Sequence, residues 1–445
     1  MNQPLSRLHS RAVALLERFR TSLFVVPMLF VIAAVVIAQV TLALDRFDRI
    51  GTFNLPFEGS TVDGARAVLT TVGAATIGFA GVAFSVSLLV VQMASSQYSP
   101  RVVSGLLSNS FSKRVMGTVV GTFTYCLMVL RAVRSESGDD GEDIVASFSV
   151  SLGVLLGVVS ILAIIAFINN SAHSMDVSEL FQRLTDDSVA VVRNEWREPD
   201  EYPIEIDEIS EVPDHASVVH FTTSGWIQRI DHDRLLELLP EGTTFHLDVT
   251  TGRYAVMGTA LGSLVPAPDE TEPGSGDTVA DAVRGTVHVG AARTSRQDVG
   301  YGIRQLSDVA LRALSTGVND PTTAQDALFH ICVILRQLLE RRPPPVVTVG
   351  DRGRRVVRHH VYDHRELVDF SFEQIRRAAA DDPSVCVYLL ESIHLLGQSL
   401  DHATDDARQA LIDQARLVVR NCENGRNIDA DVGLVREAFR RRFEA

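Results

Sequence analysis

The chain has 445 residues, of which 46% are hydrophobic, 22% are charged and 7% are aromatic, and its mean hydropathy is +0.14. This composition excludes an intrinsically disordered chain and a small disulfide-stapled scaffold, and it favours a membrane protein. The charge is uneven: residues 1–175 hold 12 basic and 10 acidic residues, a net charge of +2, whereas residues 176–445 hold 29 and 45, a net charge of −16. The sequence therefore predicts a membrane part followed by a water-exposed part.

The N-terminal residues predict a helix that leads into a first span. Residues 1–20 carry apolar side chains at helical spacing with arginines between them, which indicates an amphipathic helix on an anionic cytoplasmic surface. A plain helical extension of the span would show the same pattern. Residues 21–44 are all uncharged and can cross a hydrocarbon core of about 30 Å. This run is too long for a signal peptide, and we expect it to stay attached.

Three further uncharged runs predict three more spans, at about residues 67–93, 115–133 and 144–169. The second run becomes polar at its end, so its helix is expected to project beyond the bilayer. The third run is the shortest and spans comfortably only if flanking basic side chains reach the two interfaces. Together the runs predict a four-helix transmembrane domain over residues 21–175.

Basic residues near the span ends predict the orientation. With both termini inside, eight of these residues lie on the cytoplasmic side and five outside, and the acidic loop 136–143 lies outside. The four cysteines have no pairing spacing, which is typical of a reducing compartment. We predict a multi-pass protein of the bacterial cytoplasmic membrane, with membrane lipid as a partner and with both termini in the cytoplasm.

Polar side chains within the spans are the candidates for a pore lining. Ser85, Ser87 and Gln92 lie among apolar residues of the second span, and polar side chains in a membrane tend to face a bundle interior or a wet cavity. Hydrogen bonds that merely hold helices together are the plainer explanation. Arg131, near the outer end of the third span, is a fourth candidate as an anion-attracting position or a partner of the acidic loop, although simple snorkelling would also place it there.

Glycines in three of the spans predict close helix packing, because they let helix backbones approach where lipid offers no hydrophobic drive. We expect a tight bundle or a homo-oligomer. The glycines are Gly73, Gly78 and Gly81 in the second span, Gly117 and Gly121 in the third, and Gly153 and Gly157 in the fourth.

The C-terminal half changes pattern twice. Residues 176–214 predict an amphipathic connecting helix and a linker, and residues 215–292 alternate short β-rich runs with turn residues, which predicts a small β-rich module. Residues 298–445 return to a helical period, with an exposed hairpin expected at 346–360. The predicted fold class is an α-helical four-span membrane bundle followed by a cytosolic α+β region, in which a small β-rich module precedes an α-helical domain.

Two stretches carry a family resemblance. They are FSVSLLVVQMASSQYSPRVV at residues 84–103 and YGIRQLSDVALRALSTGVNDPTTA at residues 301–324. With them, nearly the whole chain resembles the bacterial membrane proteins grouped as domain of unknown function 2254 (DUF2254). The resemblance implies four spans and a cytosolic C-terminal region, and it implies no established activity.

The densest polar segment of the helical domain contains Arg304, Asp308, Arg312, Asn319 and Asp320. The first three are spaced i, i+4, i+8 and share one helix face. A salt-bridge ladder followed by a capping turn explains the pattern, and a ligand clamp is the alternative that makes these five residues candidate binding residues.

Two other clusters are weaker. His359, His360, Asp363 and His364 are metal-ligand types, but no further pair at metal-site spacing accompanies them, so we predict no metal. The arginines between residues 352 and 358 could contact phosphates of lipid or nucleic acid. In a region of net charge −16 without interleaved aromatics, a solvated basic hairpin tip or an internal partner for the acidic surface is favoured, and we predict no nucleic-acid partner.

The sequence holds no phosphate-binding glycine loop, HExxH, GxSxG or paired CxxC motif. We therefore predict no enzyme and no cofactor. The glycine-rich, serine-bearing spans favour an oligomeric channel or pore for ions or small solutes, regulated by its cytosolic domains. The alternative is a membrane-anchored scaffold or ligand sensor without conduction.

Overall fold

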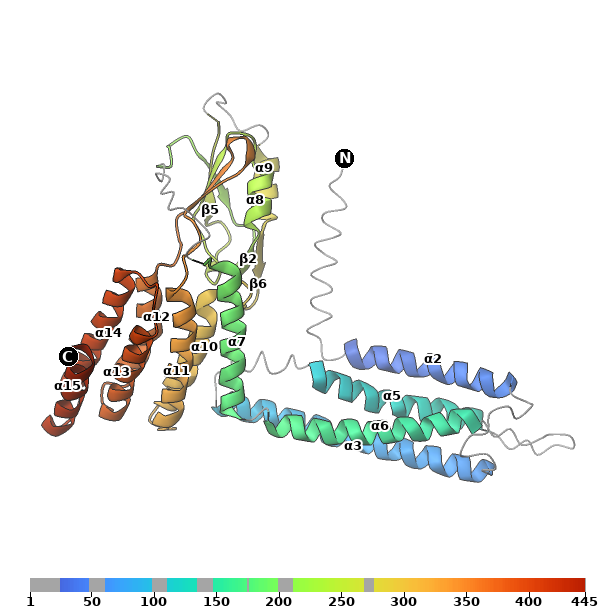
Figure 1. The fold of residues 1–445 in the computed structure, drawn as a ribbon. Helices are drawn as coiled ribbons and strands as arrows, with labels where there is room; N and C mark the ends of the chain where they lie inside the picture. The colour runs from blue at the N-terminus through green and yellow to red at the C-terminus, as the bar shows by residue number, and fades with distance from the viewer. Residues whose placement is uncertain are drawn as a thin grey trace, which may run out of the picture. The chain divides into compact units, whose positions relative to one another are not determined.

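The computed structural model describes residues 25–47, 61–97, 110–133, 147–173, 176–198, 211–267 and 276–444. It divides into two compact units, an N-terminal unit, Met1–Asp176, and a C-terminal unit, Val177–Ala445 (Figure 1). The predicted lead-in helix at residues 1–20 and the acidic loop at residues 136–143 lie outside the described residues.

Four long apolar helices form the described part of the N-terminal unit. They are α2 (Val25–Phe47), α3 (Val62–Gln97), α5 (Ser110–Ala132) and α6 (Ser147–His173). Each is long and apolar enough to cross a membrane, and a helix suits that setting because it satisfies its backbone groups internally. The 36 residues of α3 extend about 54 Å, well beyond a hydrocarbon core of about 30 Å.

Helix α5 lies at the centre of this bundle and packs against α2, α3 and α6 (Figure 1). Its two glycines admit α2 closely: a Cβ atom on Gly117 would lie 2.7 Å from the Phe30 ring, and one on Gly121 would lie 3.3 Å from the Phe30 carbonyl oxygen. The predicted GxxxG of the third span is therefore occupied by a helix of the same chain.

The GxxxG of α6 is occupied in the same way by α3. A Cβ atom on Gly153 would lie 2.9 Å from Leu69, and one on Gly157 would lie 2.9 Å from Val72. Both motifs thus serve packing within the bundle, where close backbone approach replaces hydrophobic drive.

Two small sheets form the β-rich part of the C-terminal unit, with strand orders β1-β5-β3-β8-β7 and β4-β2-β6. Helices α8 (His232–Leu238) and α9 (Gly276–Arg284) accompany them, and Leu235, Phe245 and Val283 are fully buried in the shared core. The strands are β1 (Ser217–His220), β2 (Gly225–Ile230), β3 (Thr244–Leu247), β4 (Tyr254–Ala255), β5 (Ala260–Val265), β6 (Val287–Gly290), β7 (Val347–Val349) and β8 (Arg355–Arg358).

The hairpin at residues 346–360 corrects the sequence analysis, which expected it to be exposed. Strand β8 pairs in parallel with β3, and Val356 and Val357 are buried. The hairpin therefore completes the five-stranded sheet, although it lies between helices in the sequence. Parallel pairing with a strand far earlier in the chain leaves no local signal, unlike an antiparallel hairpin.

Within the predicted β-rich module, the run at residues 253–259 forms only a short strand. Only Tyr254 and Ala255 pair with β2, and the chain then turns through Gly258, whose φ of 86° lies in the left-handed region that favours glycine. The next residues, 260–265, form β5, which lies between β1 and β3.

Seven helices form the rest of the C-terminal unit, as far as the chain is described (Figure 1). Several begin at sequence-evident caps, among them Asp320, which accepts a hydrogen bond from the Thr323 N–H ahead of Pro321. The predicted fold class is confirmed. The helices are α7 (Val177–Glu195), α10 (Val299–Ala313), α11 (Pro321–Leu339), α12 (His364–Ala378), α13 (Pro383–Gln398), α14 (Asp405–Asn424) and α15 (Asp429–Phe443).

Candidate functional site

The serines predicted to line a pore lie in the second half of α3. Ser85 is exposed and its hydroxyl donates to the Gly81 carbonyl at 2.9 Å, and Ser87 donates to the Ala83 carbonyl at 2.9 Å. Each hydroxyl therefore donates within its own helix. Gln92 is exposed near the end of the helix.

Part of the α3 surface is not covered by the other helices of the same chain. A Cβ atom on Gly78 or Gly81 would meet nothing within 4 Å, in contrast to the covered glycines of α5 and α6. The exposed residues around them, Ile77, Val82 and Phe84, are apolar. Small and polar positions thus share an open helix surface with lipid-compatible side chains.

Arg131 lies in the last turn of α5 and is exposed. At this end of the bundle Arg66 of α3 binds the backbone: its Nε and Nη2 atoms donate to the Val133 carbonyl at 3.3 and 3.0 Å. This carbonyl directly follows α5, so the guanidinium satisfies and neutralises a helix C-terminus. From the sequence, Arg66 is only one of the basic residues near the span ends that predict the orientation.

Asp45 caps the N-terminus of a helix, whereas Arg66 binds beside a helix C-terminus. Its carboxylate accepts hydrogen bonds from the Phe148 N–H at 3.0 Å, the Ser149 N–H at 3.1 Å and the Ser149 hydroxyl at 2.5 Å. These donors belong to the first turn of α6, where an anion complements the unpaired N–H groups and the helix dipole. A residue at the end of α2 therefore acts as the N-terminal cap of α6.

Tyr125 extends this network into α5. Its hydroxyl, on a fully buried side chain, donates to the Ser149 carbonyl at 2.9 Å and lies 3.1 Å from the Thr41 hydroxyl. Thr41, Tyr125, Ser149 and Asp45 thus join α2, α5 and α6 at one end of the bundle. These contacts hold the three helices together.

In the C-terminal unit, the predicted ligand residues divide between two local motifs. Arg304 and Asp308 form an ion pair at 3.1 Å on α10, and Arg312 lies in the last turn of the same helix. Asp320 caps α11, and Asn319 precedes it with a φ of 50°. The Arg304–Asp308 pair is one step of the predicted ladder, and Asp320 supplies the predicted cap.

The histidine-rich segment is likewise divided among separate contacts. His359 Nε2 lies 3.0 Å from His246 Nδ1 across the β3–β8 pair, Asp363 forms the capping box of α12, and His364 Nε2 contacts the Arg341 carbonyl at 2.9 Å. Within the described residues, no group of three or more metal-ligand side chains could hold a metal ion.

A cluster around Arg358, the last residue of β8, was not predicted from the sequence: Arg358 acts electrostatically on Glu195 of α7 and on His232 of α8. Burial raises the pKa of the Glu195 carboxyl to about 7, against the opposing effects of Arg358, Gln297 and Arg229. Burial and the charge of Arg358 lower the pKa of His232 to about 3. Arg358 is itself buried enough for its pKa to be lowered.

Two atoms of this cluster have no hydrogen-bond partner among the described residues, the buried Arg358 Nε and His232 Nδ1. Arg358 does donate through Nη1 to the Pro345 carbonyl at 3.0 Å. The Gln297 side chain is fixed by two hydrogen bonds to the backbone of Ile230, at 2.8 and 3.2 Å. The cluster thus contains buried polar atoms without a hydrogen-bond partner. Leaving such atoms unpaired in a low-dielectric interior lowers the stability of the fold.

Arg293 and Asp298 form an ion pair in which both side chains are hydrogen-bonded. Arg293 donates to Asp298 through two nitrogens at 2.5 and 3.0 Å, and its guanidinium carbon lies 6.0 Å from the Trp226 ring centre and 5.3 Å from that of Tyr301. Asp298 also precedes α10 as its N-cap residue. The ion pair therefore fastens β2 to the helical part through bidentate and cation–π contacts.

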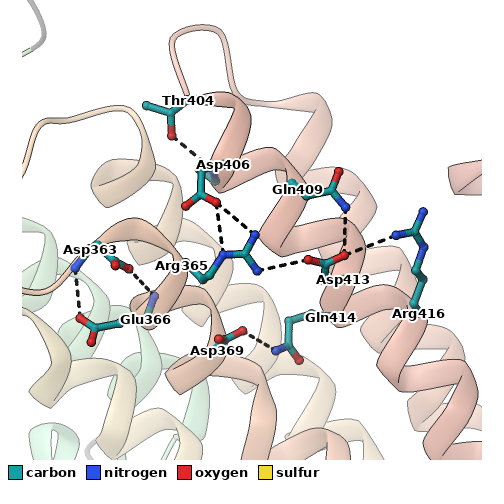
Figure 2. Close-up of polar contacts among 11 residues, drawn as sticks. Asp363, Arg365, Glu366, Asp369, Thr404, Asp406, Gln409, Asp413, Gln414 and Arg416 are labelled. Atoms are coloured by element: carbon teal, nitrogen blue, oxygen red, sulfur yellow. Dashed lines mark hydrogen bonds and ion pairs between the residues drawn. The ribbon is translucent and has the colours of Figure 1, made fainter.

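Helices α12 and α14 are joined by ion pairs and a side-chain hydrogen bond (Figure 2). Arg365 donates to Asp406 at 3.1 and 3.2 Å and to Asp413 at 3.1 Å, while Gln414 donates to Asp369 at 2.7 Å. The Arg365, Asp406 and Asp413 side chains are each more than one third exposed. Exposed ion pairs of this kind are typical of a solvated helix surface.

Comparison with known proteins places the chain among membrane proteins without an assigned reaction. A family model described as predicted membrane protein (DUF2254) matches residues 20–394, which confirms the resemblance found from the two motifs. Uncharacterized proteins of Mycobacterium bovis and Mycobacterium tuberculosis are each 29% identical over 393 residues, covering 88% of this chain and 74% of theirs. No solved structure matches.

Proposed function

Because the chain belongs to the DUF2254 family of predicted membrane proteins, we propose that it forms a homo-oligomer in the bacterial cytoplasmic membrane whose α3 helices surround a narrow path for ions or small solutes. The C-terminal unit regulates this path. Membrane lipid and further copies of the chain are the partners, and the protein performs no reaction and takes no nucleic acid.

The uncovered surface of α3 is the observation that carries this proposal. The glycines of α5 and α6 are covered by Phe30, Leu69 and Val72, whereas Gly78 and Gly81 meet nothing within 4 Å. Small residues are favoured where transmembrane helices pack. If a second copy of the chain covered Gly78 and Gly81, these glycines would allow close helix packing, as the glycines of α5 and α6 do within one chain.

The polar residues of the same helix supply the path. A serine hydroxyl that donates to its own backbone still carries acceptor lone pairs, so Ser85 and Ser87 can line a narrow aqueous path without breaking the helix. Gln92 extends the polar surface, and Arg131 attracts anions at the far end of the bundle. The length of α3 allows the path to continue beyond the hydrocarbon core.

We further infer that both termini lie in the cytoplasm, from the basic residues near the span ends. Fusions of a cytoplasmic reporter and a periplasmic reporter to each terminus test this orientation. Activity of the cytoplasmic reporter alone at both ends is expected, and opposite signals from the two ends would overturn it.

Flux through purified protein in liposomes tests conduction. Ser85→Cys should lose flux when a charged thiol reagent is added, because the modified side chain would obstruct the path. Leu162→Cys on α6 is a matched control, since Leu162 is 61% exposed on an apolar helix surface and faces lipid in this proposal. Absence of flux at every voltage and ion gradient, or equal inhibition of both variants, would overturn the proposal.

The sensor alternative is favoured by one observation, the incompletely paired cluster of Glu195, His232 and Arg358 in the C-terminal unit. Such perturbed groups occur at functional sites more often than elsewhere. A deletion of residues 177–445 separates the two functions: unregulated flux from the remaining helices supports the channel, whereas an unchanged cellular phenotype without any flux contradicts both.

A further inference from the structure

The β7–β8 hairpin joins the five-stranded sheet at its edge. In the described sheet, β7 pairs with β8 and β8 pairs with β3, so the β3–β8 ladder connects the hairpin to the other strands. Just beyond the end of β8, the His359 N–H donates to the Leu247 carbonyl at 3.0 Å. The side chain of His359 meets that of His246, the residue before Leu247 in β3. A pair of histidines therefore lies at one end of this ladder.

The two imidazoles share an in-plane hydrogen bond. His246 Nδ1 lies 3.0 Å from His359 Nε2, the ring centres are 5.2 Å apart, and the ring planes differ by 20°. The ring centres are thus 2.2 Å further apart than the two nitrogens, which is close to two ring radii. The nitrogens therefore lie near the line between the ring centres, and the rings meet edge to edge. In this geometry one nitrogen donates a proton and the other offers its lone pair.

The setting of His246 opposes a positive charge. Its residue is only 1% exposed. Burial lowers the pKa of His246, and the neighbouring His359 lowers it further, whereas Asp248 acts in the opposite direction. Among the described groups that act on His246, Asp248 is the one carboxylate.

The adjacent strands place uncharged side chains level with His246. They are Ser263 of β5 and Val357 of β8. Along β8, Arg355 lies on the same side of the strand as Val357, and Arg358 lies on the opposite side, because side chains alternate. These two arginines add positive charge to β8. A second proton on the histidine pair would therefore bring two cations together where the neighbouring strands offer little to offset them.

We propose that His246 and His359 form an acid-sensitive clasp, which holds the end of β8 against β3 and opens when both imidazoles are protonated. A first additional proton is compatible with the contact, because an imidazolium can donate to a neutral imidazole. The second proton occupies the lone pair that accepts this hydrogen bond, so two N–H donors of like charge would face each other. This inference does not depend on conduction.

Opening the clasp would act on the helical part of the C-terminal unit. In the chain, the hairpin lies between α11 and α12. The bond from the His359 N–H to Leu247 is the ladder contact nearest to the clasp, so it is the first that we expect to be lost. Acid would thus release the segment that leads into α12.

The direction of the pH effect follows from proton linkage. The closed clasp excludes the second proton, whereas separated histidines bind it near their ordinary pKa of about 6.5. The open form therefore binds more protons below this pH, and acid favours it. The lowered pKa of His246 has the same sign, since a contact that needs neutral histidine is stable above about pH 6.5 and is lost as the pH falls.

Hydrogen exchange on the full-length protein in lipid nanodiscs tests the clasp. After correction for the intrinsic exchange rate, protection of the backbone amides at residues 355–359 should fall about tenfold between pH 7.5 and pH 5.5. The amides of β1, at residues 217–220, are an internal reference, because β1 pairs with β5 in the same sheet. Their protection should change much less.

Variants of the two histidines distinguish the clasp from a general effect of acid. His359→Gln should keep its protection at pH 5.5, because an amide can donate to neutral His246 or accept from protonated His246. His246→Gln removes the pair from the β3 side and should give the same result, so the test does not depend on one substitution. His360→Gln, at the exposed next residue, is the matched control and should behave as the wild type.

Three outcomes would overturn the clasp. They are wild-type protection at residues 355–359 that does not change with pH, an equal fall at residues 217–220, and a pH dependence that survives in His359→Gln and His246→Gln.

Discussion

The two units use polar contacts in different ways. In the described N-terminal unit, polar side chains bind the ends of helices or one another between helices: Asp45 caps α6, Arg66 binds the carbonyl that follows α5, and the buried Ser160 hydroxyl donates to Thr122 at 2.9 Å. The C-terminal unit distributes many ion pairs over exposed helix surfaces, such as that of Arg365 with Asp406. A polar group within lipid that loses its protein partner stays unpaired, whereas a polar group on a water-exposed surface can form a hydrogen bond with water instead.

This comparison predicts that Asp45 matters most. Asp45→Ala removes three hydrogen bonds from the first turn of α6, and we expect a loss of about 3 kcal/mol in unfolding free energy because the donors remain in a poorly hydrated setting. Reversible unfolding in mixed detergent micelles measures this loss.

Asp63→Ala is the matched control for Asp45. Asp63 is an exposed acid in the first turn of α3, so its replacement should cost less than about 1 kcal/mol, the usual value of a charge at a helix end. Equal losses in the two variants would contradict the special role assigned to the polar end of the bundle.

The glycines sharpen the comparison within the N-terminal unit itself. Gly157→Ala places a methyl group 2.9 Å from Val72, and we expect about 1 to 3 kcal/mol of destabilisation from overpacking. Gly81→Ala has open space around it and should stabilise the isolated bundle by up to about 1 kcal/mol, because alanine favours the helix.

The same pair separates the bundle from the proposed oligomer. If copies pack through α3, Gly81→Ala should weaken the oligomer, measured by mass photometry in nanodiscs, while Gly157→Ala leaves the subunit number unchanged. Equal subunit numbers in the wild type and in Gly81→Ala would argue that no copy packs at this surface.

The sequence predicts what depends on local pattern. Uncharged runs predicted the four spans, and the cap at Asp320 followed from residue type and position. Asp45 was missed because its partners begin 103 residues later, and because it lies one residue beyond the uncharged run. Glu195 was missed since its neighbours come from the ends of distant elements, and charges at such ends look like ordinary solvated residues.

The buried histidines should make a smaller contribution that acid removes, whereas protonation of Glu195, whose pKa is raised, acts in the opposite direction. Burial lowers the pKa of both His232 and His246, so the unfolded state binds more protons. Stability is complete above the unfolded pKa of about 6.5 and is lost as the pH falls. For His232 the expected loss is about 1 kcal/mol between pH 6.5 and 5.5.

Thermal unfolding of the full-length protein across this pH range tests the histidine effect. His232→Gln should remove the loss that His232 contributes, so that this variant keeps more of its stability on acidification than the wild type does, whereas His402→Gln, an exposed position, should leave the pH dependence unchanged. An acid dependence that is identical in the two variants would remove His232 as its source.

The smallest effect is expected at the network of Figure 2. Arg365→Ala deletes contacts with Asp406 and Asp413, yet these side chains are exposed, and water and salt screen their attraction. The melting temperature should therefore hardly change, and any change should vanish in high salt.

Arg376 is the informative contrast, because it is buried and donates to Gln414 at 3.1 Å between the same two helices. Arg376→Ala should destabilise the unit clearly and independently of salt, since it leaves a buried amide oxygen unpaired. Equal effects of the two substitutions would mean that exposure does not decide the value of a polar contact in this protein.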